Sequence, residues 1–130
     1  MKIKKLLFAS ALLFSAYNAS AQTQVIAHRG FWKTEGSAQN SIAALLKADS
    51  IGCYGSEFDV WLAADDQLVV NHDPTFKGKR MENSPSTALT AIKLDNGESL
   101  PTLAKYLKAA QPLHTRLILE LKAHSTPLRE

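Results

Sequence analysis

The sequence has 130 residues, of which 45% are hydrophobic and 21% charged, as is ordinary for a soluble globular protein. This composition excludes a mainly disordered or collagen-like chain, and the single cysteine, Cys53, excludes an internal disulfide or a multi-cysteine metal site. The formal charge of +3 comes from three lysines among the first five residues, and without them acidic and basic residues number twelve each. We therefore expect no nucleic-acid partner.

The first 21 residues have the layout of a secretory signal peptide. The three lysines precede an apolar run, Leu6–Ala16, and the segment closes with Ala-Ser-Ala at 19–21. This run is shorter than the roughly 20 apolar residues that cross a bilayer, and no later stretch is long enough. We expect cleavage after Ala21 and export of residues 22–130 to the periplasm or the medium. The alternative for this segment is an N-terminal amphipathic or buried helix.

A short strand and a helix open the remaining chain. The apolar run 24–28 predicts a buried strand that stops at a polar loop. Between Asn40 and Ile51 apolar side chains recur at spacings of three and four, which predicts a helix. We expect Asn40 or Ser37 to cap its start, and Gly52 follows where a helix end favours a left-handed residue.

Two further strands are expected to form a hairpin. Aromatic and β-branched residues indicate strands at 54–62 and 68–72, and the aspartate pair at 65–66 signals a turn between them. A two-residue turn at these aspartates places Asp59 opposite His72, to within a residue or two. The hairpin would thus bring a carboxylate close to an imidazole.

The second half is expected to hold a long loop, a helix and a strand. Residues 73–98 predict a loop with at most one short helix near 88–92, and loops of this length are usually functional. A helix is expected to open at Ser99 and to end before Pro112, and residues 116–122 predict a third buried strand. Strands that alternate with helices indicate an α/β fold with a parallel sheet.

Charged side chains occur where the strands end or turn. Glu57 and Asp59 are two residues apart and point to one face, where two carboxylates repel unless a cation lies between them. Glu120 and Lys122 repeat this geometry. Three carboxylates favour Mg²⁺ or Ca²⁺ over zinc. Two alternatives remain open: a solvent-facing pair for Glu57 and Asp59, and a structural ion pair for Glu120 and Lys122.

Two histidines and an arginine lie at comparable places. His28 and His72 follow strands and can transfer protons near neutral pH, and Arg29 suits binding of a phosphate or carboxylate. The alternative for His28 is a strand-end histidine hydrogen-bonded to backbone. The alternative for His72 is a histidine at the end of a hairpin, followed by the turn-forming Asp73 before Pro74. Ligands of parallel α/β folds bind at the carboxyl ends of the strands, so these groups together indicate an active site. Trp32 either lines it or packs within its loop.

At these residues the sequence resembles the glycerophosphodiester phosphodiesterase family. The resemblance runs from Val25 to Lys122 and rests on these segments: Ala27-His28-Arg29-Gly30, Asn40-Ser41, Glu57-x-Asp59-Val60, Val69-Val70-Asn71-His72-Asp73-Pro74, Asn96-Gly97-Glu98-x-Leu100-Pro101-Thr102-Leu103 and Leu119-Glu120-Leu121-Lys122. It implies a phospholipase C-like TIM-type (β/α)8 barrel. It also implies cleavage of glycerophosphodiesters, as small-molecule substrates, to glycerol phosphate and an alcohol.

The resemblance also implies roles for the charged side chains. These are acid–base catalysis by His28 and His72, phosphate binding by Arg29 and Lys122, and binding of Mg²⁺ or Ca²⁺ by Glu57, Asp59 and Glu120. The family usually has Pro-Glu-Asn-Thr where this chain has Ala38-Gln39-Asn40-Ser41, so one carboxylate near the site is replaced by an amide.

Length is the larger departure from the family. A complete barrel needs roughly 250 residues, and residues 22–130 correspond to about its first three strands. We expect a partial domain with unpaired strand edges and exposed apolar surface, which is unstable, aggregates or is covered by another copy of the chain. Two further interpretations stay open: a related phosphodiesterase acting on another lipid headgroup, and an inactive truncated fragment.

Overall fold

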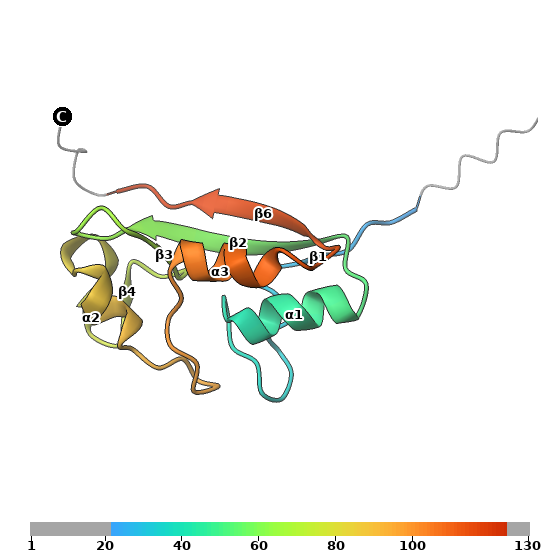
Figure 1. Cartoon of the computed structure of the whole chain (residues 1–130), viewed down its shortest axis with the longest axis horizontal. Coiled ribbons are helices and arrows are strands. Elements are labelled where there is room, and N and C mark those ends of the chain that lie inside the picture. The colour runs from blue at the N-terminus through green and yellow to red at the C-terminus, as the bar shows by residue number, and fades with distance from the viewer. Residues whose placement is uncertain (1–21, 125–130) are drawn as a thin grey trace, which may run out of the picture.

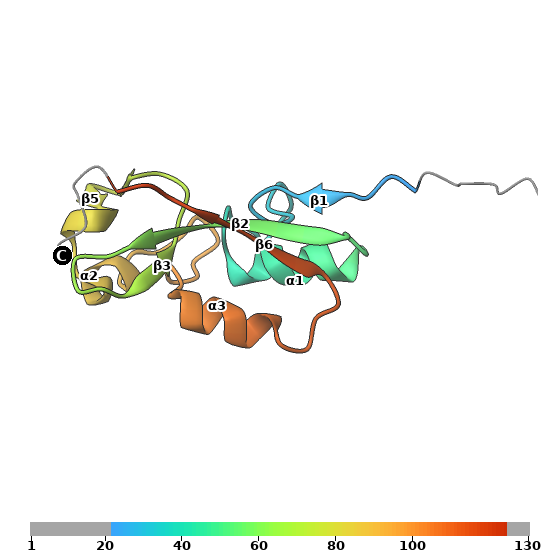
Figure 2. The same cartoon turned by 90° about the horizontal axis from the view of Figure 1, so that it is seen from above.

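The computed structural model describes residues 22–124, so the predicted signal peptide lies outside the described residues. Its main sheet contains β1 (Ile26–Ala27), β2 (Gly55–Leu62), β3 (Leu68–Val70) and β6 (Arg116–Leu121), with α1 (Ile42–Ser50) and α3 (Leu103–Ala110) beside it (Figures 1 and 2). Between β3 and α3 the chain forms β4 (Thr75–Phe76), β5 (Lys79–Arg80), a 3-10 turn (Met81–Asn83) and α2 (Ser86–Thr90). No helix in this part of the chain is long and apolar enough to cross a membrane.

Strand β2 is the centre of the sheet. It pairs in parallel with β6 along one edge, and its other edge pairs in parallel with β1 at its start and antiparallel with β3 at its end. The connections from β1 to β2 and from β3 to β6 pass through α1 and α3 (Figure 1). Three parallel strands with helices between them confirm the predicted α/β fold, as the open beginning of a TIM-type barrel.

Alternate side chains of β2 face different environments. Phe58 and Val60 point towards the helices, and the Phe58 ring stacks on Tyr106 of α3 with 4.6 Å between ring centroids. Burial of each such side chain stabilises the fold by about 1.5–3 kcal/mol. Because successive side chains of a strand point to opposite faces, Glu57 and Asp59 lie on the other face.

The helices begin later than expected. Ser41 is the N-cap of α1, since its hydroxyl accepts the backbone N–H three residues on at 3.0 Å. The prediction that Asn40 or Ser37 caps this helix is therefore wrong; Asn40 instead adopts a left-handed φ of 58°. Gly52 takes the left-handed conformation expected after the helix. Similarly, α3 opens only after its N-cap, Thr102, rather than at Ser99.

The hairpin register differs from the expected one by one residue. Asp59 lies opposite Asn71 rather than His72, and the Asn71 N–H donates to the Asp59 carbonyl at 3.1 Å. The connecting loop has three residues, Ala64–Asp66, instead of two, and Asp66 adopts a φ of 60°. Such a loop is a common hairpin solution, and its additional residue shifts the pairing by one position.

Segment 73–98 is more structured than expected. The prediction of a loop with at most one short helix is wrong, because a two-stranded hairpin and a 3-10 turn precede α2. Buried apolar side chains anchor this segment against β2 and β3: Met81, Leu89, Ile92 and Leu94 pack with Trp61 and Val69. These anchors are scattered along the segment, so they show no helical or strand period.

Asp65 lies in the hairpin loop and binds the start of α2 through its side chain. Its carboxylate accepts the Ser86 hydroxyl at 2.8 Å and the Ser86 backbone N–H at 3.0 Å, and these bonds lower the pKa of Asp65 below 3.8. A depressed folded-state pKa adds stability above the unfolded-state pKa, and this stability is lost as the pH falls through the folded-state value.

We therefore expect Asp65→Ala to lower the urea midpoint slightly at neutral pH. The difference from the unsubstituted chain should shrink as the pH is lowered below 3.8, because the carboxylate is then protonated in both states. Urea titrations at a series of pH values, followed by circular dichroism, measure this. A difference that stays constant down to about pH 2.5 would contradict the assignment.

Strand β6 is uncovered on its helix-facing side. Leu119 pairs with Phe58 and so points to the same side as Phe58, but no element among the described residues covers it. The apolar stripe consists of Leu117, Leu119 and Leu121, which are 36%, 48% and 69% exposed. The expectation of exposed apolar surface is thus confirmed, and the prediction that residues 24–28 and 116–122 form buried strands is wrong.

Candidate active site

Glu57 and Asp59 of β2 and Glu120 of β6 form a carboxylate cluster. The parallel register pairs Asp59 with Glu120, and one oxygen from each of the three lies within 4.8 Å of the others. The Asp59 side chain is fully buried, that of Glu57 is 13% exposed and that of Glu120 is 56% exposed. The shared face is confirmed, and a solvent-facing pair of Glu57 and Asp59 is excluded by their burial.

The two carboxylate oxygens of Glu57 differ: one accepts a hydrogen bond, and the other is orphaned, that is, buried without a partner. Its Oε2 accepts the Arg29 backbone N–H at 2.8 Å, whereas its Oε1 is buried without a hydrogen-bond partner. Burial raises the pKa of Glu57 above 4.5, and the neighbouring Asp59 charge raises it further, against the lowering by the Arg29 bond. An orphaned carboxylate oxygen beside two other carboxylates fits a hard divalent cation with oxygen ligands.

The ammonium group of Lys122 lies within this cluster. Its Nζ is 2.8 Å from Asp59 Oδ1 and 2.6 Å from Glu120 Oε1. Desolvation lowers the pKa of Lys122, but the bonds to the two carboxylates outweigh it and the pKa is raised above 10.5. Lys122 therefore stays charged, and the side chain expected to hold phosphate pairs here with two of the carboxylates expected to hold metal.

Each predicted histidine stands next to a carboxylate. His28 follows β1, and its Nε2 is 3.8 Å from Glu57 Oε2. His72 follows β3, and its Nδ1 is 2.8 Å from Asp73 Oδ1. A carboxylate accepts hydrogen bonds, so this contact places the proton on Nδ1 and leaves Nε2 as the atom able to take up a proton.

Arg29 lies in a tight loop between β1 and α1. It adopts a left-handed φ of 60°, and its Nη1 donates to Gln39 Oε1 at 2.5 Å. At Gly30, where φ is 76°, an added Cβ would come within 2.6 Å of the Ala44 Cβ. The loop therefore packs so closely on α1 that only glycine fits, and the amide of Gln39 accepts a bond from the arginine.

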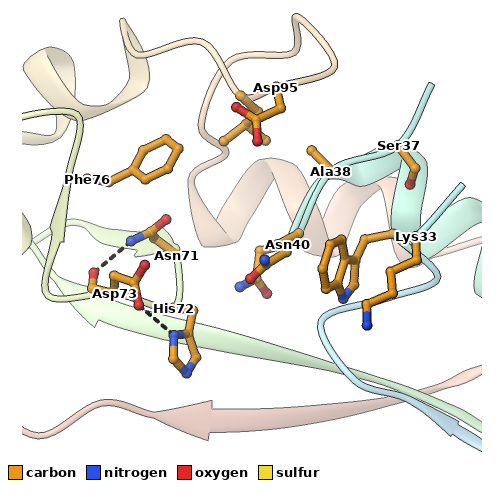
Figure 3. Close-up of a pocket in the computed structure, with 12 residues that line it drawn as sticks. Lys33, Ser37, Ala38, Asn40, Asn71, His72, Asp73, Phe76 and Asp95 are labelled. Carbon is orange, nitrogen blue, oxygen red and sulfur yellow. Dashed lines mark hydrogen bonds and ion pairs between the residues drawn. The ribbon is translucent and has the colours of Figure 1, made fainter. Parts of the chain in front are cut away.

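A cavity of about 260 Å³ opens at His72, which is the one predicted site residue among its described lining residues (Figure 3). His72, Asp73 and Phe76 lie on one side of it, and Lys33 lies on the other (Figure 3). Trp32 is also among the residues that line this cavity. The cavity offers room next to the His72 ring for a small polar molecule.

Two asparagines at the site were not among the residues expected to function. Asn71 Nδ2 donates to the Asp73 carbonyl at 2.7 Å, and so steadies the turn that carries His72. Asn40 contacts Asp59 through its side-chain amide. For Asn40, the sequence offered one indication of this role. Asparagine tolerates a left-handed backbone, which is more typical of a loop residue than of a helix cap.

Comparison with known proteins gives three informative relatives. A glycerophosphodiester phosphodiesterase from Caldanaerobacter subterraneus is 48% identical over 54 residues, which are 42% of this chain and 21% of that protein. The crystal structure of a glycerophosphodiester phosphodiesterase from Parabacteroides distasonis is 58% identical, with a TM-score of 0.78 over 80% of this chain and 44% of the other. No family model matches the chain.

The third relative is a phosphodiesterase from Oleispira antarctica, solved in complex with the product sn-glycerol-3-phosphate. It is 31% identical, with a TM-score of 0.65 over 77% of this chain and 44% of the other. The chain thus spans less than half the length of each of these relatives.

Proposed function

We propose that this chain, a partial phosphodiesterase barrel that shares sequence and fold with glycerophosphodiester phosphodiesterases, hydrolyses glycerophosphodiesters to glycerol phosphate and an alcohol. The similarity confirms the resemblance found in the sequence. The carrying observation is the carboxylate cluster of Glu57, Asp59 and Glu120, with one histidine after β1 and another after β3.

Glu57, Asp59 and Glu120 would hold a divalent cation, Mg²⁺ or Ca²⁺. When bound, such an ion neutralises charge on the phosphoryl oxygens. The burial of Asp59 and the orphaned oxygen of Glu57 support this assignment, because close carboxylates repel one another and the single Lys122 ammonium offsets only part of their charge. The test below uses both ions.

The remaining groups supply charge and proton transfer. The Arg29 guanidinium and the Lys122 ammonium would bind phosphate oxygens. A planar guanidinium can donate two parallel hydrogen bonds to a phosphate, and an ammonium attracts it as a compact positive charge. One histidine removes the proton from the attacking hydroxyl, of water or of the substrate itself, as its oxygen bonds to phosphorus. The other donates a proton to the alcohol oxygen as the bond from phosphorus to that oxygen breaks. Attack by a substrate hydroxyl gives a cyclic phosphodiester, which water then opens to glycerol phosphate.

Product analysis on the full chain tests this function. Glycerophosphocholine is incubated with the chain and Mg²⁺ or Ca²⁺, with and without EDTA, and phosphorus NMR follows release of glycerol phosphate. Metal-dependent release supports the proposal. Cleavage of intact sphingomyelin or phosphatidylinositol instead favours a related enzyme with another headgroup. Failure on all these substrates favours an inactive fragment and contradicts the proposal.

We also propose that residues 22–130 are exported after cleavage behind Ala21. Support comes from the charged start, the short apolar run and the small residues of the first 21 positions. Expression of the whole chain in a double-membraned bacterium, fractionation and mass determination of the periplasmic protein measure this. A full-length product retained inside the cell contradicts export.

The apolar stripe of Leu117, Leu119 and Leu121 supports self-association. We expect the double substitution Leu119→Lys and Leu121→Lys to weaken association by about 2–4 kcal/mol, or roughly 30- to 1000-fold, because two leucines leave an apolar contact. Sedimentation over a range of concentrations measures this, with Leu46→Lys on the exposed side of α1 as the matched control. Equal association of both variants contradicts a contact through β6.

A further inference from the structure

Asn40 makes a two-point contact with the buried carboxylate of Asp59. Its Nδ2 donates to Asp59 Oδ2 at 2.8 Å, and its Oδ1 accepts the Asp59 backbone N–H at 3.2 Å. Asn40 is 2% exposed and Asp59 is fully buried, so water does not compete for these bonds. Because the amide donates with one atom and accepts with the other, only one orientation of the Asn40 side chain satisfies both contacts.

We propose that Asn40 is a positioning residue, which fixes the Asp59 carboxylate for cation binding. With Oδ2 bound to Asn40, the other oxygen, Oδ1, is directed towards Glu120 and Lys122, where the carboxylate cluster meets. The amide is uncharged, so it orients the carboxylate without cancelling the charge that attracts a cation. This inference rests on the proposed metal site and adds a residue to it.

The backbone of Asn40 is shaped for this contact. It adopts a left-handed φ of 58°, which asparagine tolerates better than most residues, and its N–H donates to the Arg29 carbonyl at 3.0 Å. The helix gains nothing from this geometry, because Ser41 caps α1 by itself. Asn40 therefore links the loop of the phosphate-binding Arg29 to the buried carboxylate of Asp59.

Loss of the amide would leave Asp59 Oδ2 buried without its donor. The carboxylate would then be held only at Oδ1, by Lys122, and its other oxygen would no longer be fixed. Substitution of a residue that orients a metal ligand typically lowers the metal affinity by roughly 10- to 100-fold. We expect a loss of this size for variants at position 40.

Two variants separate orientation from folding. Asn40→Gly keeps the left-handed backbone without strain and removes the amide, whereas Asn40→Asp keeps the size and replaces the donor with a second carboxylate. Asn96→Asp is the matched control, since Asn96 also donates to a carboxylate, that of Glu98, outside the cluster. Calorimetric titration of each full chain with MgCl₂ or CaCl₂ gives the affinity, and urea unfolding gives the stability.

We expect both Asn40 variants to bind the ion about 10- to 100-fold more weakly, with the Asn96 variant unchanged. A loss of affinity in Asn40→Gly at an unfolding midpoint close to the original supports positioning. Unchanged affinity in both Asn40 variants overturns it and leaves the metal site intact. An unsubstituted chain that binds neither ion contradicts the proposed metal site itself, and this inference falls with it.

Discussion

Replacing His72 with alanine is expected to lower kcat for glycerophosphodiester hydrolysis by about 10²- to 10⁴-fold, with a much smaller effect on KM. The reason is geometric. Asp73 Oδ1 lies 2.8 Å from Nδ1 of His72, which leaves Nε2 to exchange a proton beside the cavity. Loss of this group would remove proton transfer to or from the reacting oxygen and leave Arg29 and Lys122, the proposed phosphate ligands, in place.

Release of glycerol phosphate from glycerophosphocholine at saturating metal measures this effect. His114→Ala is the matched control, because His114 is exposed and lies before β6, away from the cavity. Asp73→Asn is expected to cost less than His72→Ala, since it alters the tautomer and orientation of the ring but keeps the ring itself. Equal kcat in His72→Ala and His114→Ala would exclude His72 from proton transfer.

The carboxylate cluster was predictable because it depends on short-range rules. Residues two apart on a strand share a face, which joins Glu57 to Asp59, and parallel strands bring their carboxyl ends to one edge, which adds Glu120. The shared face of Glu57 and Asp59 does not depend on register, whereas Glu120 joins that face because β6 pairs with β2 in the register Asp59–Glu120. The fold class was predictable for the same reason, from the alternation of strands with helices.

The contacts that refine the site were not predictable in the same way. The position of Asn71 opposite Asp59 depends on a three-residue hairpin loop, and a turn signal in the sequence does not fix loop length. The role of Asn40 was obscured by its place beside a helix start, where asparagine is also a common cap. Tertiary contacts with Asp59, rather than local preference, decide its conformation.

Burial was predicted least well for the outer strands. The leucines of β6 predict a buried strand, because apolar runs are usual in parallel sheets that helices cover on both faces. Whether a strand is covered depends on elements elsewhere, and in the described part of the chain nothing packs on Leu119 and Leu121. The apolar run of β6 is therefore typical of a covered strand in a complete barrel, whereas in the described part of the chain this strand is exposed.

The second large effect is expected for Asp59→Asn, which removes one charge at nearly constant size. Affinity for Mg²⁺ or Ca²⁺ should fall by more than about 100-fold, beyond the effect of a residue that only orients a ligand. Stability is expected to depend on the metal. Without metal, the substitution relieves repulsion from Glu57 and Glu120 but also removes the ion pair with Lys122, which lies 2.8 Å from Asp59, so the urea midpoint of the variant should be equal or lower.

With metal, the unsubstituted chain should gain stability that the Asp59→Asn variant lacks. A ligand at one hundred times its Kd stabilises the folded state by about 2.7 kcal/mol, so the two unfolding curves should separate on addition of the ion and rejoin with EDTA. Asp95→Asn, at an exposed aspartate outside the cluster, is the control and should follow the unsubstituted chain. If the ion stabilises Asp59→Asn equally, the three carboxylates are not the metal site. Their role is then to hold the Lys122 ammonium, which already lies 2.8 Å from Asp59.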